Sequence, residues 1–224
     1  MRAGRGGRLR RRALAAGVLV LLGHGLSPDV RAGAQLEEPL VDKVRSALAA
    51  SVADAAPPRT SFAAIDDRLA YLHWLGAMSE RLKKRKSEHL IRVEFLEAVW
   101  YESKRAGLEP ALVMGLIQVE SGFRKYAISV AGARGYMQVM PFWARTIGSG
   151  DPSRLFHMQT NLRFGCVILR HYLDIEKGDL FLALGRYNGS RGRSEYPSAV
   201  FANRRQWLMD GSAQAVTEGI RSGG

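Results

Sequence analysis

Glu120 has the clearest chemical potential in this sequence, because it ends a run of apolar residues at helical spacing. The segment LVMGLIQVE closes on Glu120, and steps of four and three place Val113, Ile117 and Glu120 on one helix face. Burial disfavours a charged carboxylate, so we expect a raised pKa, the property of a general acid near neutral pH. The spacing alone leaves two alternatives open: a side chain that turns to solvent at the helix end, or one that pairs with a nearby arginine.

Short polar motifs follow this glutamate along the chain. Ser121 comes directly after it, residues 135–138 read GYMQ, and residues 186–189 read RYNG. Each motif alone is weak, since Tyr187 also fits a helix C-terminal turn and Gln138 a polar loop. Their order and spacing together make the set specific.

Other catalytic sets are absent from the sequence. Cys166 is the single cysteine and lies on an apolar helical stripe, so we expect a buried, inert thiol. The histidines are scattered, metal-ligand spacing is missing, and no glycine loop is suited to a phosphate. Asp151 and Asp179 fit helix caps or turns, so no second catalytic acid stands out. We therefore expect neither a metal nor a cofactor.

The elements that must position these residues are helices. Periodic apolar residues predict an all-α fold with a minimal β component, and no alternating strand run of useful length is present. Residues 121–140 are glycine-rich and form a loop-rich insertion. Ser87 is placed to cap one helix, and proline is placed to open two others. The helices are expected at about 40–52, 65–82, 88–99, 110–120, from 141, 162–176, 179–187 and 196–209.

The amino terminus has the pattern of an export signal. The chain of 224 residues carries a net charge of +12, and residues 1–34 contain seven arginines and one acid, about half of that excess. A basic stretch precedes the apolar run 13–22, which is shorter than the roughly 20 residues of a membrane-spanning helix. The small residues 32–34 offer a cleavage site before Gln35, so we expect an exported, periplasmic protein; an uncleaved amino-terminal anchor is the alternative.

Composition and breakpoints divide the chain into five parts. The apolar content of 46% and the charged content of 24% are those of a globular protein. The parts are a signal peptide (1–34), a helix with a proline-containing linker (35–61), a helical extension (62–91), a catalytic domain (92–209) and a flexible tail (210–224).

Over roughly residues 92–209 the sequence resembles the soluble lytic transglycosylase (SLT) domain, a relative of goose-type lysozyme. The glutamate-serine pair of that family matches Glu120 and Ser121, and its glycine-leucine-methionine-glutamine motif matches residues 135–138. Its alanine-tyrosine-asparagine motif matches residues 186–188. Tyr136 replaces the leucine and Arg186 replaces the alanine, which affects the shape of the groove and the preferred glycan.

The resemblance implies a lysozyme-like helical fold and cleavage of the β-1,4 bond between N-acetylmuramic acid and N-acetylglucosamine in peptidoglycan. A single glutamate suits substrate-assisted chemistry, in which Glu120 acts as acid and then base and a 1,6-anhydro ring closes without water. By family similarity Ser121 orients Glu120 or its ligand, and Tyr187 hydrogen-bonds at the reacting centre. The remaining residues implied to contact substrate bind sugar groups or line the groove: Gly135, Tyr136, Met137, Gln138 and Asn188.

Two other functions remain open on the sequence: a lysozyme that uses water, and a scaffold that binds glycan or serves a wall-spanning assembly without cutting. Peptidoglycan strands are the expected partner, with a secretion or cell-wall machinery as a further one. Nucleic acid is not expected, because only the overall charge favours it and basic and aromatic residues are not interleaved. No stable membrane span is expected after signal cleavage.

Overall fold

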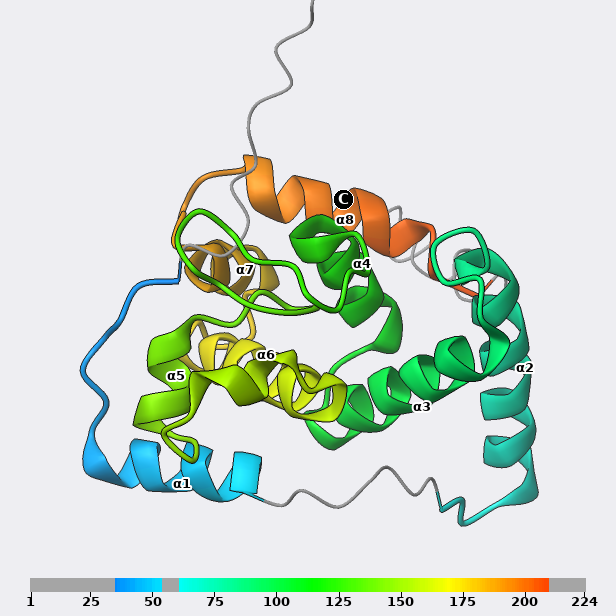
Figure 1. Cartoon of the computed structure of the whole chain (residues 1–224), viewed down its shortest axis with the longest axis horizontal. Coiled ribbons are helices and arrows are strands. Elements are labelled where there is room, and N and C mark those ends of the chain that lie inside the picture. Colours follow the sequence, from blue (N-terminus) through cyan, green and yellow to red (C-terminus); the bar gives the residue numbers. More distant parts are fainter. Residues whose placement is uncertain (1–34, 54–60, 210–224) are drawn as a thin grey trace, which may run out of the picture.

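A computed structural model of the chain describes residues 35–53 and 61–209 (Figure 1). The predicted signal peptide (1–34), part of the predicted linker (54–60) and the predicted tail (210–224) lie outside the described residues. Within the described ranges the elements are α-helices, one 3₁₀ helix and no strand. They are α1 (Asp42–Ala53), α2 (Ile65–Leu82), α3 (His89–Arg105), α4 (Pro110–Ser121), α5 (Pro141–Thr146), η1 (Pro152–Phe156), α6 (Met158–Ile175), α7 (Leu180–Asn188) and α8 (Glu195–Arg205).

The all-α prediction is confirmed, and most helix boundaries follow local chemistry. Pro110 and Pro141 open α4 and α5, where a missing N–H costs nothing. The carboxylate of Asp179 caps α7 by accepting the N–H of Leu182 at 3.0 Å. The expected cap at Ser87 is wrong, because α3 begins one residue later, after Glu88.

The last helix is shorter than predicted. We expected it to reach residue 209, but α8 ends at Arg205. The indole of Trp207 turns back against Phe123 and donates its N–H to the side-chain oxygen of Gln118 at 2.8 Å, so packing against α4 replaces the final helical turn.

Helix α4 is the central element and is buried on almost every side. Helix α8 lies across it, as Figure 1 shows, and the crossing is a backbone-to-backbone contact at Gly115. A Cβ at Gly115 would come within 2.6 Å of the backbone nitrogen of Arg204. Only glycine permits this close approach, which fixes α8 against the helix that carries Glu120.

The loop between α4 and α5 is compact. Its only ladder-like pairs within the described residues are two isolated bridges, Ile128 with Arg134 and Arg134 with Val139. Asn161 of α6 holds the loop: its carboxamide oxygen accepts the N–H of Met137 at 2.8 Å, and its nitrogen donates to the carbonyl of Arg134 at 2.8 Å. Gly135 has φ +75°, and a Cβ there would meet Asn161 at 2.4 Å, so glycine is required.

Two amino-terminal pieces pack on this domain. Helix α2 covers α3 with an apolar face that includes Trp74 and Met78. Helix α1 lies along α6, with Leu48 and Val52 buried between them. Among the described residues, no helix combines the length and hydropathy needed to cross a bilayer.

Candidate active site

Glu120 lies in the last turn of α4, and only 4% of its surface is exposed. Its carboxylate accepts a hydrogen bond from the hydroxyl of Tyr196 at 2.5 Å. The carboxylate is therefore inside the protein, and the alternative of a side chain turned to solvent is wrong.

Tyr196 is contributed by the first turn of α8 and is 1% exposed. Burial raises the pKa of its hydroxyl well above the ordinary value, and the charge of Glu120 raises it further. The phenol consequently keeps its proton at neutral pH and remains a donor to the carboxylate.

A second buried glutamate, Glu102, is occupied by an ion pair. The guanidinium of Arg163 donates to the same Glu102 oxygen at 3.0 Å and 2.8 Å, and Gln159 also donates to it. Among the described residues these two glutamates are the buried acids, and Glu120 is the one beside the predicted motifs.

Ser121 connects the glutamate's helix to the glycine-rich loop. Its hydroxyl donates to the carbonyl of Tyr136 at 2.7 Å and lies 3.1 Å from the carbonyl of Ile117. The contact predicted from the resemblance was with Glu120 or its ligand; the hydroxyl instead fixes the loop relative to the helix end.

The loop residues Met137 and Gln138 are buried, with side chains turned into the protein. Met137 packs on Gly165, where an added Cβ would come within 2.3 Å of its sulfur. The Gln138 amide nitrogen donates to the carbonyls of Gly135 at 2.9 Å and Ala127 at 3.1 Å. These side chains therefore shape the loop, and their backbone carbonyls face other parts of the chain: the Met137 carbonyl faces Tyr187 and the Gln138 carbonyl faces Gln35.

Tyr136, the second residue of the same motif, contacts Lys86 of the amino-terminal extension. Its hydroxyl accepts from the ammonium of Lys86 at 2.7 Å, and that ammonium lies 4.6 Å from the centre of the Tyr136 ring. Burial raises the pKa of Tyr136 to about 12. Burial lowers the pKa of Lys86, and the nearby charge of Lys125 lowers it further. The extension that carries Lys86 is thus attached directly to the motif.

Tyr187 and Asn188 end helix α7 beside this loop. The Tyr187 hydroxyl donates to the carbonyl of Met137 at 2.8 Å, and burial, followed by the charge of Glu120, raises its pKa well above the ordinary value. The amide nitrogen of Asn188 donates to Ser190 at 3.1 Å. Its oxygen is buried without a hydrogen-bond partner in the described part of the chain, which leaves one acceptor unused.

Arg186 precedes these two residues and is held by carboxylates on both sides. It pairs with Glu176 at the end of α6 at 2.9 Å and with Glu38, ahead of α1, at 2.7 Å. Arg191 also pairs with Glu176, at 2.7 Å. Hydrogen bonding from Arg191 is the main reason that the pKa of Glu176 falls to about 2.

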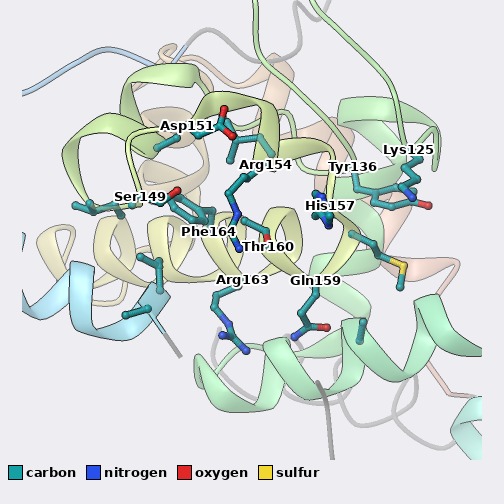
Figure 2. Close-up of a pocket in the computed structure, with 18 of the residues that line it drawn as sticks. Lys125, Tyr136, Ser149, Asp151, Arg154, His157, Gln159, Thr160, Arg163 and Phe164 are labelled. Atoms are coloured by element: carbon teal, nitrogen blue, oxygen red, sulfur yellow. The ribbon is translucent and has the colours of Figure 1, made fainter. Parts of the chain in front are cut away.

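A cavity of about 1040 Å³ lies between α1, α3 and α6, and the loop between α4 and α5 forms part of its wall. Figure 2 shows Tyr136 and Lys125 at one end of it and Ser149 and Asp151 at the other. Glu120 is not among its lining residues, so this cavity is adjacent to the candidate site and does not contain the acid.

The cysteine, histidine and acidic side chains of the described residues do not gather into a further cluster. No group of three or more histidine, cysteine or acidic side chains is gathered there as a metal site. Cys166 is fully buried, and burial raises the pKa of its thiol well above the ordinary value, as expected for an inert core residue. Asp151 and Asp179 cap η1 and α7, as predicted.

The structure thus brings Glu120, Tyr187 and the Met137 carbonyl together, and it adds Tyr196, which the sequence analysis missed. The available signal was a lone tyrosine at the start of the predicted helix 196–209, and nothing in its spacing linked it to Glu120.

The family model for the transglycosylase SLT domain matches residues 97–208, half of the chain. The chain belongs to this family, and its helical fold is the one expected for an SLT domain.

Individual relatives are transglycosylases by name. The chain is 38% identical over 84 residues to membrane-bound lytic murein transglycosylase C of Actinobacillus pleuropneumoniae serotype 5b. The matched region covers 34% of this chain and 23% of the relative. It is 31% identical over 121 residues to the transglycosylase of Enterobacteria phage PRD1, covering 50% of this chain and 43% of the relative. It therefore spans less than half the length of either relative.

A solved structure, an inactive mutant of the lytic transglycosylase Slt from Pseudomonas aeruginosa, is also similar. The identity is 22% and the TM-score is 0.39, over 66% of this chain and 27% of that one.

Proposed function

We propose that this protein is a peptidoglycan lytic transglycosylase in which Glu120 is the single general acid and base. The observation that carries the proposal is the buried Glu120 carboxylate, hydrogen-bonded by Tyr196 at the junction of the matched motifs. Membership of the SLT family and the printed names of the relatives support the same reaction class.

In the proposed reaction, protonated Glu120 gives its proton to the glycosidic oxygen between N-acetylmuramic acid and N-acetylglucosamine. The bond from that oxygen to C1 breaks, and the N-acetylglucosamine side leaves with a free hydroxyl. The acetamido group of the muramic acid stabilises the positive charge that develops at C1. The C6 hydroxyl oxygen then bonds to C1 while its proton returns to the Glu120 carboxylate. A 1,6-anhydro ring closes, the acid is regenerated, and no water is consumed.

The roles of three other acids in the described residues support this scheme over the two-carboxylate one. A nucleophile or base is expected at roughly 5–9 Å from the acid in most glycosidases. In the described residues Glu102 is paired with Arg163, and Asp151 and Asp179 are caps.

Tyr196 and the matched residues are proposed to shape the site around this acid. Tyr196 holds the carboxylate, and Tyr187 holds the carbonyl of Met137. Asn188, whose buried side-chain oxygen has no hydrogen-bond partner in the described residues, is proposed to bind a polar group of the sugar. The remaining matched residues, which keep the loop in place and form the edge of the sugar site, are Ser121, Gly135, Tyr136 and Gln138.

We also propose an envelope location for the chain. Relatives named as membrane-bound transglycosylases and the signal-like pattern of residues 1–34 support export to the periplasm, after cleavage or with an uncleaved anchor. Peptidoglycan strands are the proposed substrate, and a secretion or cell-wall machinery is the proposed further partner.

The test is Glu120→Gln, which keeps the shape of the side chain but cannot exchange the proton. We expect turnover of purified peptidoglycan to fall by roughly 10²- to 10⁴-fold, the contribution of a positioned acid or base. Glu88→Gln, an exposed glutamate ahead of α3 whose side chain makes no cap hydrogen bond, is the matched control and should retain wild-type turnover.

The products decide the reaction class. Mass spectrometry of wild-type digests should find 1,6-anhydro ends. Reducing ends would assign the protein as a hydrolase, and equal clearing by wild type and Glu120→Gln would remove Glu120 from the mechanism.

A further inference from the structure

The segment that precedes α1 lies directly on the candidate site. Gln35 is only 4% exposed, although it is the first described residue. Its carboxamide oxygen accepts the backbone N–H of Met140 at 3.2 Å, and its nitrogen lies 3.5 Å from the carbonyl of Gln138. The same side chain hydrogen-bonds with Tyr187.

An ion pair ties the same segment to the Arg186-Tyr187-Asn188 motif. Both oxygens of Glu38 accept from one nitrogen of Arg186, at 2.7 Å and 3.0 Å. Arg186 is itself held by Glu176. The arginine that departs from the family pattern is therefore the residue that secures residues 35–41, which we call the strap.

Helix α1 holds the other end of the strap in place. Leu48 and Val52 are buried against the domain, and the guanidinium of Arg105 donates to the carbonyl of Ser51 at 2.6 Å. Figure 1 shows the strap running from α1 along one side of the molecule to α7. The strap is thus anchored at α1, and its other end, Gln35, lies at the candidate site; we call Gln35 the tip.

The chemistry of the tip resembles that of the proposed substrate. A primary carboxamide offers one N–H donor and one C=O acceptor side by side, as does the N-acetyl group of an amino sugar. Gln35 uses both against the Gln138 carbonyl and the Met140 N–H, beside Tyr187. While the strap is seated, the Met140 N–H is already bound and the Gln138 carbonyl already faces the Gln35 nitrogen, so an amide of a glycan would have to compete with Gln35 for them.

We propose that the strap is an autoinhibitory element that competes in cis with amide-bearing glycan for the loop beside Glu120. The proposal rests on the function proposed above. A partly exposed ion pair and neutral hydrogen bonds are individually weak. A polymer that makes several contacts at once displaces the strap, and a partner that binds residues 35–41 activates the enzyme.

The first test measures turnover of peptidoglycan by the purified full chain. Gln35→Ala and Glu38→Gln should each lower KM several-fold with little change in kcat, because an intramolecular competitor is weakened. Glu37→Gln, the exposed neighbour of Glu38, is the matched control and should behave as wild type. A synthetic peptide of residues 35–41, added in excess, should return Gln35→Ala to the wild-type KM. Unchanged or raised KM in both strap variants would overturn the proposal.

The second test does not need catalysis. N-acetylglucosamine oligomers are titrated into each chain, and exchange of the Met140 amide hydrogen is followed by NMR. The strap variants should bind the oligomers several-fold more tightly and exchange this hydrogen faster than wild type. Tighter binding without product from any chain would support the strap and refute the proposed reaction. Normal product formation with equal oligomer binding would refute the strap alone.

Discussion

Tyr196 gives the buried carboxylate of Glu120 a fixed neutral donor. The phenol is buried, and burial and the charge of Glu120 raise its pKa. The hydroxyl therefore stays protonated at neutral pH. A hydrogen bond that stabilises a buried carboxylate also fixes its direction. In the proposed reaction Glu120 would therefore approach the glycosidic oxygen without a search among rotamers.

Tyr196→Phe removes only the hydroxyl. Hydrogen bonds to charged groups contribute about 1.5–3 kcal/mol, so we expect turnover to fall roughly tenfold to a hundredfold. Circular dichroism should show a folded chain. Tyr101→Phe, on α3 away from the motifs, should keep wild-type turnover. A Tyr196→Phe chain with full turnover would show that the carboxylate needs no such positioning.

At the scale of elements, the loop between α4 and α5 is held by close packing on α6. Asn161 binds its backbone, and the Met137 side chain fills the space above Gly165. The Met137 carbonyl is then presented to Tyr187. The geometry of the loop consequently depends on a residue of α6 that has no side chain.

Gly165→Ala tests this dependence. The new methyl group would lie within 2.3 Å of the Met137 sulfur, and overpacking of this kind costs about 1–3 kcal/mol. We expect both the free energy of unfolding and the turnover to fall, measured by chemical denaturation and by peptidoglycan release. Gly76→Ala on α2 meets nothing within 4 Å and should instead stabilise the chain by about 0.5–1 kcal/mol. Equal effects from the two changes would contradict the argument.

At the scale of the whole molecule, widely separated parts of the chain meet at the site. The strap comes from the amino-terminal side, Glu120 from the middle and Tyr196 from the carboxyl-terminal side. The strap and α1 are held by fewer buried side chains than α4, so they should open without unfolding the domain.

Hydrogen exchange measures this difference. Amides of α1 should exchange far faster than those of α4. Leu48→Ala should abolish the remaining protection of α1 and leave α4 unchanged, because the buried Leu48 side chain anchors α1. Val41→Ala changes an exposed side chain and should have no effect. Loss of protection in α4 together with α1 would mean that the two unfold as one unit.

The sequence predicted the helices and put Glu120 on the apolar face of its helix, because these depend on local periodicity and on caps such as Asp179; it left open whether the Glu120 side chain turns to solvent. It did not predict which backbone groups these side chains bind. The Gln138 amide folds back onto its own loop, and the Ser121 hydroxyl binds the Tyr136 carbonyl. Such bonds depend on the exact path of the loop between α4 and α5, and no motif spacing encodes that path.

The partnership of Glu120 with Tyr196 was hidden for the same reason. The two residues are 76 positions apart, and only the crossing of α4 and α8 brings them together. The strap was hidden too, since residues 35–41 carry no motif and make their contacts only in the folded chain.

The glycine contact between α4 and α8 has a mechanical consequence. With main chain against main chain at Gly115, neither helix has a compressible layer through which it can slide or rock. Glu120 on α4 and Tyr196 on α8 are therefore expected to move together as one rigid unit. In the proposed reaction, any movement needed to admit a bulky polymer would fall on the surrounding loops, and Glu120 and Tyr196 would keep their spacing.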